Sequence, residues 1–507
     1  MRALLLAGLM MAGTVGARVL DQGWRYVVYP EEVVSTDGRN SRIVDDNSSV
    51  LIRYNLSDLP LDTSLNSVIW YKGKASGSGA NPSFAVWAVD DAGAKIERIS
   101  EVTIRPDTDG PIPFPVTEYV SRHLKDETIS FRIEMRSAPG FSQAVEFSET
   151  PSLAVVKAQA PFYDLQALLH PVWHGSRMAN ETVLPTSYEG GPAAGNLAFV
   201  PSKIVSVRNY ALDTTYEEGK DYVVEDRSVR LVPGSSIPFL RHDELYHDNP
   251  NGKPNVMRTV SDGYLTFSEG PFFNDKQLVV TYEHDALWGG PVPQSAKDFL
   301  PQTFQIFEKG IPLKLAVFGD SISVGSSASG KCIRPPFMPR WGDLVAAELQ
   351  RFYGSDIDCI NPSLGGMRSD WGRDTVDGLL SFEKPDLVIL GFGMNDAGVP
   401  FSETQYADNI RAIMKSLRKQ NPNVEFILLM SFQPNSKWRS LEPMPGYLEA
   451  LKEMQGPGVA IVDIWSLHGY LLEDKTYWDM TGNHVNHPND FIVRIYAQAL
   501  LSALGIE

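Results

Sequence analysis

The sequence predicts an α/β domain at the C-terminal end of the chain, over residues 295–507, preceded by two β-rich domains over residues 19–157 and 160–290. Three observations support this division. A chain of 507 residues is too long for a single hydrophobic core. Before residue 290, short runs alternate apolar and polar residues between turns, which is typical of antiparallel sheets. After residue 295, apolar runs alternate with amphipathic stretches, as in a parallel sheet covered by helices on both faces.

The first residues are typical of a secretory signal peptide. Arg2 gives a positive start, an apolar run follows over residues 3–12, and small residues suited to cleavage end at Ala17. We expect residues 1–17 to be removed on export, which makes the protein secreted or periplasmic; the alternative is an ordinary buried first helix. The apolar run is too short to span a bilayer, so we expect no membrane insertion.

The net charge of −17 argues against nucleic acid or an anionic membrane as a partner. Binding to phosphates needs a basic patch on the protein. The charge identifies no substrate, and the sequence indicates no oligomeric state.

The first β-rich domain contains the runs "SVLIRYNLSDLP", "FAVWAVD" and "TISFRIEMRS", which indicate an antiparallel β-sandwich. Its segment "FPVTEYVSRHLKDETISFRIE", followed by "VEFSETPSLAVV", resembles the end of the carbohydrate-binding jelly-roll modules of secreted polysaccharide-degrading enzymes. The resemblance covers most of residues 45–157 and implies a fold and a glycan context, without naming a binding residue. The alternative is a spacer domain.

The second β-rich domain is indicated by "TTYEEGKDYVVEDRSVRLVPG" and "QLVVTYEHDALW", which are typical of strands joined by tight turns. Between them lies the polar loop "RHDELYHDNPNGKPN". Its histidines and aspartates do not repeat at a diagnostic metal-ligand spacing, so we expect a solvated loop and no metal site.

The C-terminal domain contains five apolar runs: "LKLAVF", "DIDCIN", "PDLVILG", "VEFILLM" and "VAIVDI". Open parallel sheets bind ligands at the carboxyl ends of their strands. Ser321 directly follows the first of these strands, in "LAVFGDSISVG". The serine could begin a helix that needs an N-cap, or it could be a nucleophile presented on a tight turn, and its place at the ligand-binding edge favours the nucleophile.

Gly319-Asp320-Ser321 and three further blocks, in the same order along the chain, resemble the SGNH (GDSL-type) hydrolases. The resemblance implies a serine esterase with a flavodoxin-like, three-layer α/β/α hydrolase domain, here preceded by two β-sandwich or jelly-roll domains. It assigns the nucleophile to Ser321.

The second and third blocks, "NPSLGGMRS" and "GFGMNDAG", imply the donors of an oxyanion hole. By resemblance, the first supplies the backbone N–H of Gly366, with Gly365 as the neighbouring alternative, and glycine allows the backbone to approach a substrate closely. The second supplies the side-chain amide of Asn395, while Asp396 is a structural hydrogen-bonding partner. Such donors stabilise the negative charge that develops in acyl transfer.

The fourth block, "DMTGNHVNHPND", implies that His487 is the general base for Ser321. It departs from the family, because the position three residues before His487 holds His484 instead of aspartate. Either Asp479 orients the imidazole as a third member, or a backbone carbonyl does so and the site is a Ser–His dyad. We favour the dyad, because a turn-forming stretch follows Asp479. Asp490 is better placed at a helix N-terminus.

Arg368, Trp371 and Trp478 are expected in loops that flank the site. Aromatic rings there suit stacking on a sugar, and we consider these residues candidate substrate contacts. The alternative is that they only line the surface of the domain.

Together these features predict an exported carbohydrate esterase that removes O-acetyl groups from a glycan, with the acetylated glycan as its partner. By resemblance the reaction needs neither a metal nor an organic cofactor. One alternative is a lipid- or thioester-directed esterase of the same fold. Another is a non-catalytic glycan-binding protein, which only the missing aspartate supports.

Overall fold

The computed structural model divides the chain into two compact units, residues 1–160 and 161–507. In the second unit the structure describes residues 163–248, 256–332, 334–399 and 401–507. In the first it describes residues 17–20, 25–28, 30–35, 43–45, 49–56, 64–77, 81–105, 108–124, 126, 128–136, 143–147 and 151–158. Residues 1–16, in which the signal peptide was expected, lie outside the described residues.

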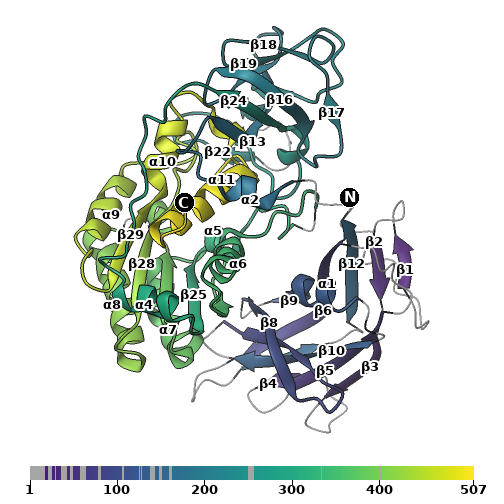
Figure 1. Cartoon of the computed structure of the whole chain (residues 1–507), viewed down its shortest axis with the longest axis vertical. Coiled ribbons are helices and arrows are strands. Elements are labelled where there is room, and N and C mark those ends of the chain that lie inside the picture. Colours follow the sequence, from purple (N-terminus) through teal and green to yellow (C-terminus); the bar gives the residue numbers. More distant parts are fainter. Residues whose placement is uncertain are drawn as a thin grey trace. The chain divides into compact units, whose positions relative to one another are not determined.

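The first unit is built from two antiparallel sheets (Figure 1). One contains, in spatial order, β1 (Ala17–Leu20), β2 (Arg25–Val28), β12 (Ser152–Ala158), β6 (Ser64–Gly77), β11 (Gln143–Phe147) and β4 (Ile43–Asp45), with β9 (Asp109–Pro115) paired to β6. The other contains β3 (Pro30–Ser35), β5 (Ser49–Asn55), β10 (Thr128–Arg136), β7 (Ser83–Val89) and β8 (Lys95–Thr103). A short helix, α1 (Thr117–Arg122), precedes β10.

The alternation in the sequence explains how these two sheets pack. Val50 and Ile52 of β5 share one buried core with Ile69 and Tyr71 of β6, which belongs to the other sheet. Side chains on a strand point to opposite faces in turn, so one face of each sheet is apolar and the two faces close over each other. The expected β-rich, two-sheet character is confirmed, and the jelly-roll topology stays a prediction.

The second unit contains the parallel sheet expected at the C-terminal end. In spatial order its strands are β26 (Ile357–Ile360), β25 (Leu313–Gly319), β27 (Leu387–Gly391), β28 (Glu425–Met430) and β29 (Val459–Asp463). Every described pair is parallel. In chain order this is 2-1-3-4-5, the flavodoxin-like arrangement, which places ligands beside the carboxyl end of the first strand.

Helices cover both faces of this sheet. Leu315 and Val317 of β25 point into a core shared with α4 (Pro301–Lys309), α6 (Trp341–Tyr353), α10 (Ile464–Leu471) and α11 (Asp490–Ala503). Ala316 and Phe318 point into a second core shared with α7 (Ser369–Leu379), α8 (Glu403–Gln420) and α9 (Pro443–Lys452). The domain therefore has three layers (Figure 1). None of the helices in the described part of the chain is long and apolar enough to cross a bilayer.

The β-rich half of this unit contains three small sheets. The first is β13 (Arg177–Val183), β24 (Leu278–His284), β16 (Pro201–Asn209) and β17 (Thr215–Tyr216). The second is β18 (Tyr222–Glu225), β19 (Ser228–Leu231), β15 (Ala194–Asn196), β14 (Thr186–Ser187) and β20 (Leu240–Arg241). The third is β21 (Tyr246–His247), β23 (Tyr264–Thr266) and β22 (Val256–Arg258). Short helices lie beside them: α2 (Leu165–Leu169), α3 (His242–Leu245) and η2 (Asn274–Lys276).

These sheets do not form a domain of their own, unlike the separate domain expected over residues 160–290. Val183 and Val280 belong to the same hydrophobic core as residues of the parallel sheet and α11. Helix α11 lies beside β13 and α2 (Figure 1). Its Arg494 donates hydrogen bonds to Ala179 O and Asn180 O of the β-rich half. The two halves are therefore held by one continuous core.

A buried ion pair also joins the two halves. Lys475 Nζ lies 2.5 Å from Glu181 Oε1, and neither side chain is exposed to solvent. The ammonium group also donates hydrogen bonds to Thr182 O (3.0 Å) and Asn196 O (2.9 Å). Every donor of the lysine is thus used, which is the condition under which a buried charge is tolerated.

We expect Lys475→Met to lower the free energy of unfolding by about 3–5 kcal/mol, because it leaves the Glu181 carboxylate buried without its cation. The free energy is measured by urea denaturation. The matched control is Lys452→Met, because Lys452 forms an exposed ion pair with Glu449 that is worth at most about 1 kcal/mol. Equal effects of the two substitutions would contradict the role given to the buried pair.

Candidate active site

Ser321 is the first residue of α5 (Ser321–Val324), directly after β25. The helix is capped by Asp320, whose carboxylate accepts a hydrogen bond from Ile322 N (2.9 Å), so the serine itself does not serve as the cap. A Cβ at Gly319 would overlap Gly391 O and the Ser323 hydroxyl, so only glycine fits there. Burial raises the pKa of Asp320 to about 7. The turn leaves the Ser321 hydroxyl available to act as a nucleophile.

His487 contacts the nucleophile directly. Its Nε2 lies 2.9 Å from Ser321 Oγ. The histidine sits in the loop between η5 (Tyr477–Asp479) and α11. Asn483 holds this loop, because its side-chain oxygen accepts a hydrogen bond from His487 N (3.0 Å), and Thr481 Oγ1 donates to His487 O (2.9 Å). The two residues that the first and fourth blocks single out are therefore brought together.

The second ring nitrogen of His487 contacts Glu269, which lies in the loop after β23 in the β-rich half. His487 Nδ1 lies 3.1 Å from Glu269 Oε2, although the two residues are 218 positions apart in the sequence. Asn483 Nδ2 donates a hydrogen bond to Glu269 Oε1 (3.2 Å). Ser321, His487 and Glu269 thus form a chain of contacts with the geometry of a catalytic triad.

The Glu269 carboxyl is on the protein surface, with 52% of its side chain exposed, whereas His487 is 10% exposed. The burial that remains would raise the pKa of Glu269, but the hydrogen bonds from His487 and Asn483 and the charge of His487 outweigh it. The pKa of Glu269 therefore lies below its ordinary value. The carboxylate is ionised at neutral pH and can stabilise a protonated imidazole.

Neither alternative that we considered for the third member is correct. Asp479 is fully buried and accepts hydrogen bonds from Leu184 N (2.7 Å), Thr476 N (2.8 Å) and Thr476 Oγ1 (2.7 Å). Its carboxylate therefore ties η5 to the end of β13. Burial raises the pKa of Asp479. A backbone carbonyl does not take this place either, because the described partner of His487 Nδ1 is the Glu269 carboxylate.

His484 occupies the position at which the family pattern has aspartate, and it has a different partner. Its backbone is left-handed (φ 69°), and its ring is fully buried. Its Nδ1 lies 3.0 Å from Thr266 O, so this nitrogen carries the proton, because a carbonyl only accepts. Burial lowers the pKa of His484 to about 4, which keeps the ring neutral. Since Thr266 ends β23, His484 fixes the strand that leads to Glu269.

The loops of the second and third blocks meet beside the nucleophile. A Cβ at Gly365 would lie 3.6 Å from the Cβ of Ser321. Gly366 is exposed and has a left-handed backbone (φ 79°) that favours glycine. Asn395 is half-buried, and its Nδ2 donates a hydrogen bond to Met367 O (2.9 Å). The donor roles of Gly366 and Asn395 stay predictions.

Asp396 fixes these two loops to each other. Its buried carboxylate accepts hydrogen bonds from Ser369 N (3.0 Å) and from the Ser369 hydroxyl. Asn409 Nδ2 donates to the same hydroxyl (2.9 Å). Burial is the largest influence on Asp396 and raises its pKa. The contacts explain why an aspartate follows Asn395: it holds the start of α7, where the second block ends.

Comparison with known proteins finds a family that matches the C-terminal part of the chain. Residues 317–492 match the model of the GDSL-like lipase/acylhydrolase family. The C-terminal part of the chain is a GDSL-type hydrolase domain.

Individual relatives match this domain only in part. An arylesterase from Vibrio mimicus is 29% identical over 111 residues, which are 22% of this chain and 52% of the arylesterase. The chain thus matches about half the length of this relative. A two-domain esterase active on acetylated mannans, co-crystallised with mannopentaose, is 18% identical, with a TM-score of 0.34 over 42% of this chain and 54% of its own. A catalytic mutant of an acetylxylan esterase from Geobacillus stearothermophilus is 19% identical, with a TM-score of 0.31 over 38% and 95%.

The two tryptophans expected to contact substrate differ in their burial. Trp478 is 9% exposed and belongs to a core cluster with Leu184 and Phe273. Trp371 is half-buried and packs against Phe318, with ring centroids 5.5 Å apart. The expectation that Trp478 stacks on a sugar is therefore wrong, because its side chain is buried in this cluster. The sequence predicts that Trp478 lies in a loop that flanks the site. In the structure, side chains of the β-rich half cover this segment.

Arg368 remains a candidate substrate contact. It directly follows Met367 in the second block, and 40% of its side chain is exposed. Its guanidinium pairs with Asp370 (2.7 Å) and lies 5.3 Å from the centre of the Phe401 ring. The charge of Arg368 is thus already neutralised within the hydrolase domain.

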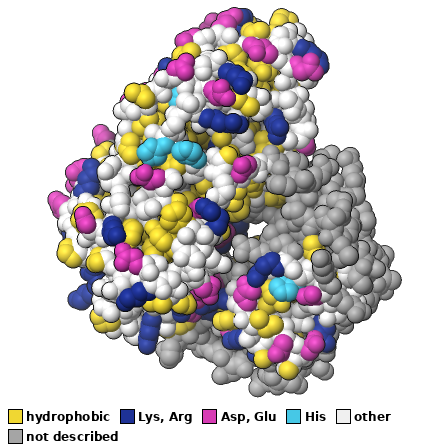
Figure 2. Space-filling model, in the orientation of Figure 1, with side chains coloured by type: hydrophobic (Ala, Val, Ile, Leu, Met, Phe, Trp, Pro, Cys, Tyr) yellow, Lys and Arg dark blue, Asp and Glu magenta, His cyan; other side chains and the backbone are white. Residues whose placement is uncertain are grey.

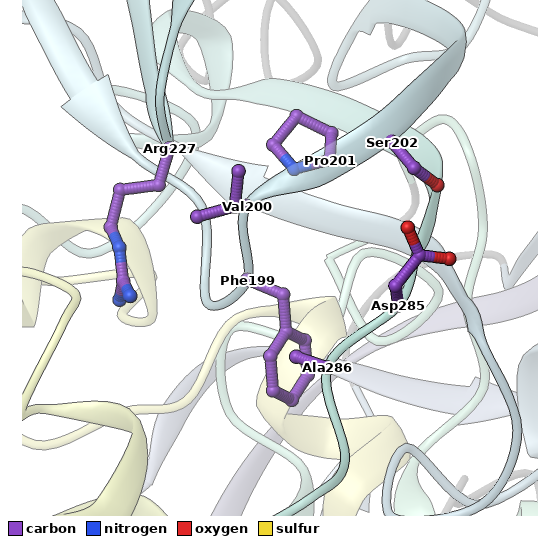
Figure 3. Close-up of a pocket in the computed structure, with 7 residues that line it drawn as sticks. All are labelled: Phe199, Val200, Pro201, Ser202, Arg227, Asp285 and Ala286. Atoms are coloured by element: carbon purple, nitrogen blue, oxygen red, sulfur yellow. The ribbon is translucent and has the colours of Figure 1, made fainter.

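A surface hollow of about 300 Å³ lies in the β-rich half, lined by Phe199, Val200, Pro201, Ser202, Arg227, Asp285 and Ala286. Arg227 and Asp285 lie on opposite sides of it (Figure 3). Arg227 is paired with Asp474, and the Phe199 ring is stacked on His284. These two lining residues therefore already have partners. Across the described residues, no group of three or more His, Cys, Asp or Glu side chains could hold a metal ion.

We expect Glu269→Gln to slow the reaction of Ser321 with a fluorophosphonate by on the order of a hundredfold or more, because the imidazole loses the charge that stabilises its protonated form. In a serine protease the equivalent change lowers kcat by about 10⁴, and the exposure of Glu269 reduces the effect. The labelling rate is followed by mass spectrometry.

Asp479→Asn is the control, and it should lower thermal stability while leaving the labelling rate of the folded protein within about twofold, because Asp479 acts in the fold. Slow labelling in Asp479→Asn, with normal labelling in Glu269→Gln, would restore the assignment of Asp479.

Proposed function

We propose that the protein is an exported carboxylic ester hydrolase that removes O-acetyl groups from a glycan through a serine acyl-enzyme. The observation that carries the proposal is the contact of Ser321 Oγ with His487 Nε2 at 2.9 Å, with Glu269 on the other ring nitrogen. A serine hydroxyl is a weak nucleophile until a base within hydrogen-bond reach accepts its proton. Export rests on the N-terminal segment alone.

In the first half-reaction, Ser321 Oγ attacks the ester carbonyl carbon while His487 Nε2 accepts the hydroxyl proton. Glu269 stabilises the imidazolium and keeps Nδ1 protonated, so that Nε2 faces the serine. The oxyanion is held by the Asn395 amide and by the N–H groups of Gly366 and Ser321, each donor being worth about 3–4 kcal/mol in such sites.

The first half-reaction ends as the tetrahedral adduct collapses: the proton leaves His487 for the oxygen of the departing sugar alcohol, and the acetyl group stays on Ser321. The second half-reaction hydrolyses this acyl-enzyme. Water then attacks this ester, and His487 accepts a proton from the water. The tetrahedral adduct collapses, Ser321 recovers its proton from His487, and acetate leaves. The contacts of His487 with Ser321 and Glu269 support the proton transfers in these steps.

The glycan as substrate class is supported by the position of the site on the protein surface. Glu269 and Gly366, on either side of the buried Ser321 and His487, are exposed, so the site opens to the surface, as a polymeric substrate requires. The N-terminal unit, which resembles carbohydrate-binding modules, supports the same class. On the face drawn in Figure 2, Lys and Arg side chains are scattered among Asp and Glu instead of forming one basic patch. The only support for a non-catalytic glycan-binding protein was the missing aspartate. The contact of Glu269 with His487 removes this support.

The test is acetate release from a panel of acetylated polysaccharides, with Ser321→Ala as the control. We expect release from at least one polysaccharide, and a loss of about a thousandfold or more in Ser321→Ala, because removal of a triad member leaves only a small residual rate. Hydrolysis of 4-nitrophenyl acetate without release from any glycan would contradict the substrate class. Faster turnover of octanoyl than of acetyl esters would favour a lipid-directed esterase.

A further inference from the structure

Arg439 lies in the loop after β28, and its guanidinium is held rigidly beside the third block of the hydrolase domain. The guanidinium carbon sits 3.9 Å from the centre of the Trp438 ring. One terminal nitrogen donates a hydrogen bond to Met394 O. The guanidinium also lies against Gly398, where any Cβ would overlap it. The Trp438 ring, Met394 O and Gly398 therefore fix the planar guanidinium in one position.

This cation has no carboxylate partner in the described part of the chain. Arg439 is half-buried, and burial lowers its pKa, with Tyr447 as the one ionisable group that opposes this. Arg368 is different, because it pairs with Asp370. A partly buried charge without a counter-ion is costly. The protein has many carboxylates, with a net charge of −17, yet none of those in the described residues pairs with Arg439.

Arg439 is also linked to the turn that carries Asn395 by the contacts already described. Met394, which accepts its hydrogen bond, is directly followed by Asn395. The Asn395 amide in turn contacts Met367 O, in the loop that passes beside Ser321. A ligand that binds the free N–H groups of Arg439 would therefore lie next to the turn that carries the oxyanion donor.

We propose that Arg439 binds a carboxylate of the substrate, so that the preferred substrate is an acidic glycan with a uronic acid residue at or beside the acetylated sugar. A planar guanidinium donates two parallel hydrogen bonds to a carboxylate, and this geometry gives specificity as well as affinity. The guanidinium carbon lies over the Trp438 ring, and the N–H groups of a guanidinium lie in its own plane, so the contact with the ring does not itself use them. The inference rests on the proposed function, and it names the class of glycan.

A purely structural role for Arg439, holding Met394 O, makes a different prediction. Removal of the guanidinium would then slow the hydrolysis of acidic and neutral substrates by the same factor. A carboxylate subsite instead predicts a change in the ratio of the two rates. This ratio is unaffected by any general loss of activity or of folded protein, because both substrates are measured with the same preparation.

The experiment compares kcat/KM for acetate release from an acetylated oligogalacturonide and from its carboxyl-reduced counterpart, re-acetylated to the same degree. We expect the wild-type protein to prefer the acidic substrate by on the order of tenfold, the range of one charge-assisted hydrogen-bonded pair. Arg439→Gln should abolish the preference, and Arg439→Lys should keep part of it, because an ammonium retains the charge and loses the bidentate geometry.

Lys437→Gln is the matched control, because it removes one positive charge from the same loop at an exposed position. It should keep the preference for the acidic substrate. Equal rates on both substrates in the wild-type protein, or a preference that survives in Arg439→Gln, would overturn the carboxylate subsite while leaving the esterase proposal intact. If the wild-type protein hydrolyses 4-nitrophenyl acetate and neither oligosaccharide, and no other acetylated glycan either, the proposed function fails and this inference fails with it.

Discussion

The contact between His487 and Glu269 is the interaction on which the rest of the site depends. A serine–histidine pair works only when the imidazole has the right tautomer and its protonated form is stabilised. Here the carboxylate for both tasks comes from the β-rich half of the unit, 218 residues before the histidine. The hydrolase domain contains Ser321, His487 and the predicted oxyanion donors, but the described contacts give its histidine a carboxylate only through the loop after β23.

Several other contacts between the β-rich half and the hydrolase domain help to hold Glu269 beside His487. His484 holds Thr266, which ends the strand before Glu269, and the buried pair of Lys475 and Glu181 joins the two halves. Asn483 holds both His487 N and the Glu269 carboxylate. A half-exposed carboxylate can keep a fixed orientation only if the backbone on both sides is fixed. The continuous core therefore serves catalysis as well as stability, because a hinge between the halves would separate Glu269 from His487.

The sequence predicted the features that depend on short motifs and on strand periodicity, which are the serine, the histidine and the parallel sheet. Ser321 and His487 lie in local patterns beside strand or helix ends, and the five parallel strands are near-continuous apolar runs. Glu269 follows Ser268 and precedes Gly270 in an ordinary turn, so its role comes only from tertiary packing. The missing aspartate before His487 was the one signal that a carboxylate must come from elsewhere. The buried contacts of Arg494 with carbonyls of the β-rich half likewise come only from tertiary packing, because no local pattern in the sequence marks them.

The most direct test of this account is the proton NMR signal of His487 Nδ1–H, in protein with ¹⁵N-labelled histidine. A histidine N–H that donates to a carboxylate gives a protected signal at low field, and His487→Ala assigns it. We expect the signal in the wild-type protein and in Asp479→Asn, and its loss or a large upfield shift in Glu269→Gln. A signal that persists unchanged in Glu269→Gln, or that disappears in Asp479→Asn, would contradict the central claim that Glu269 orients the catalytic histidine.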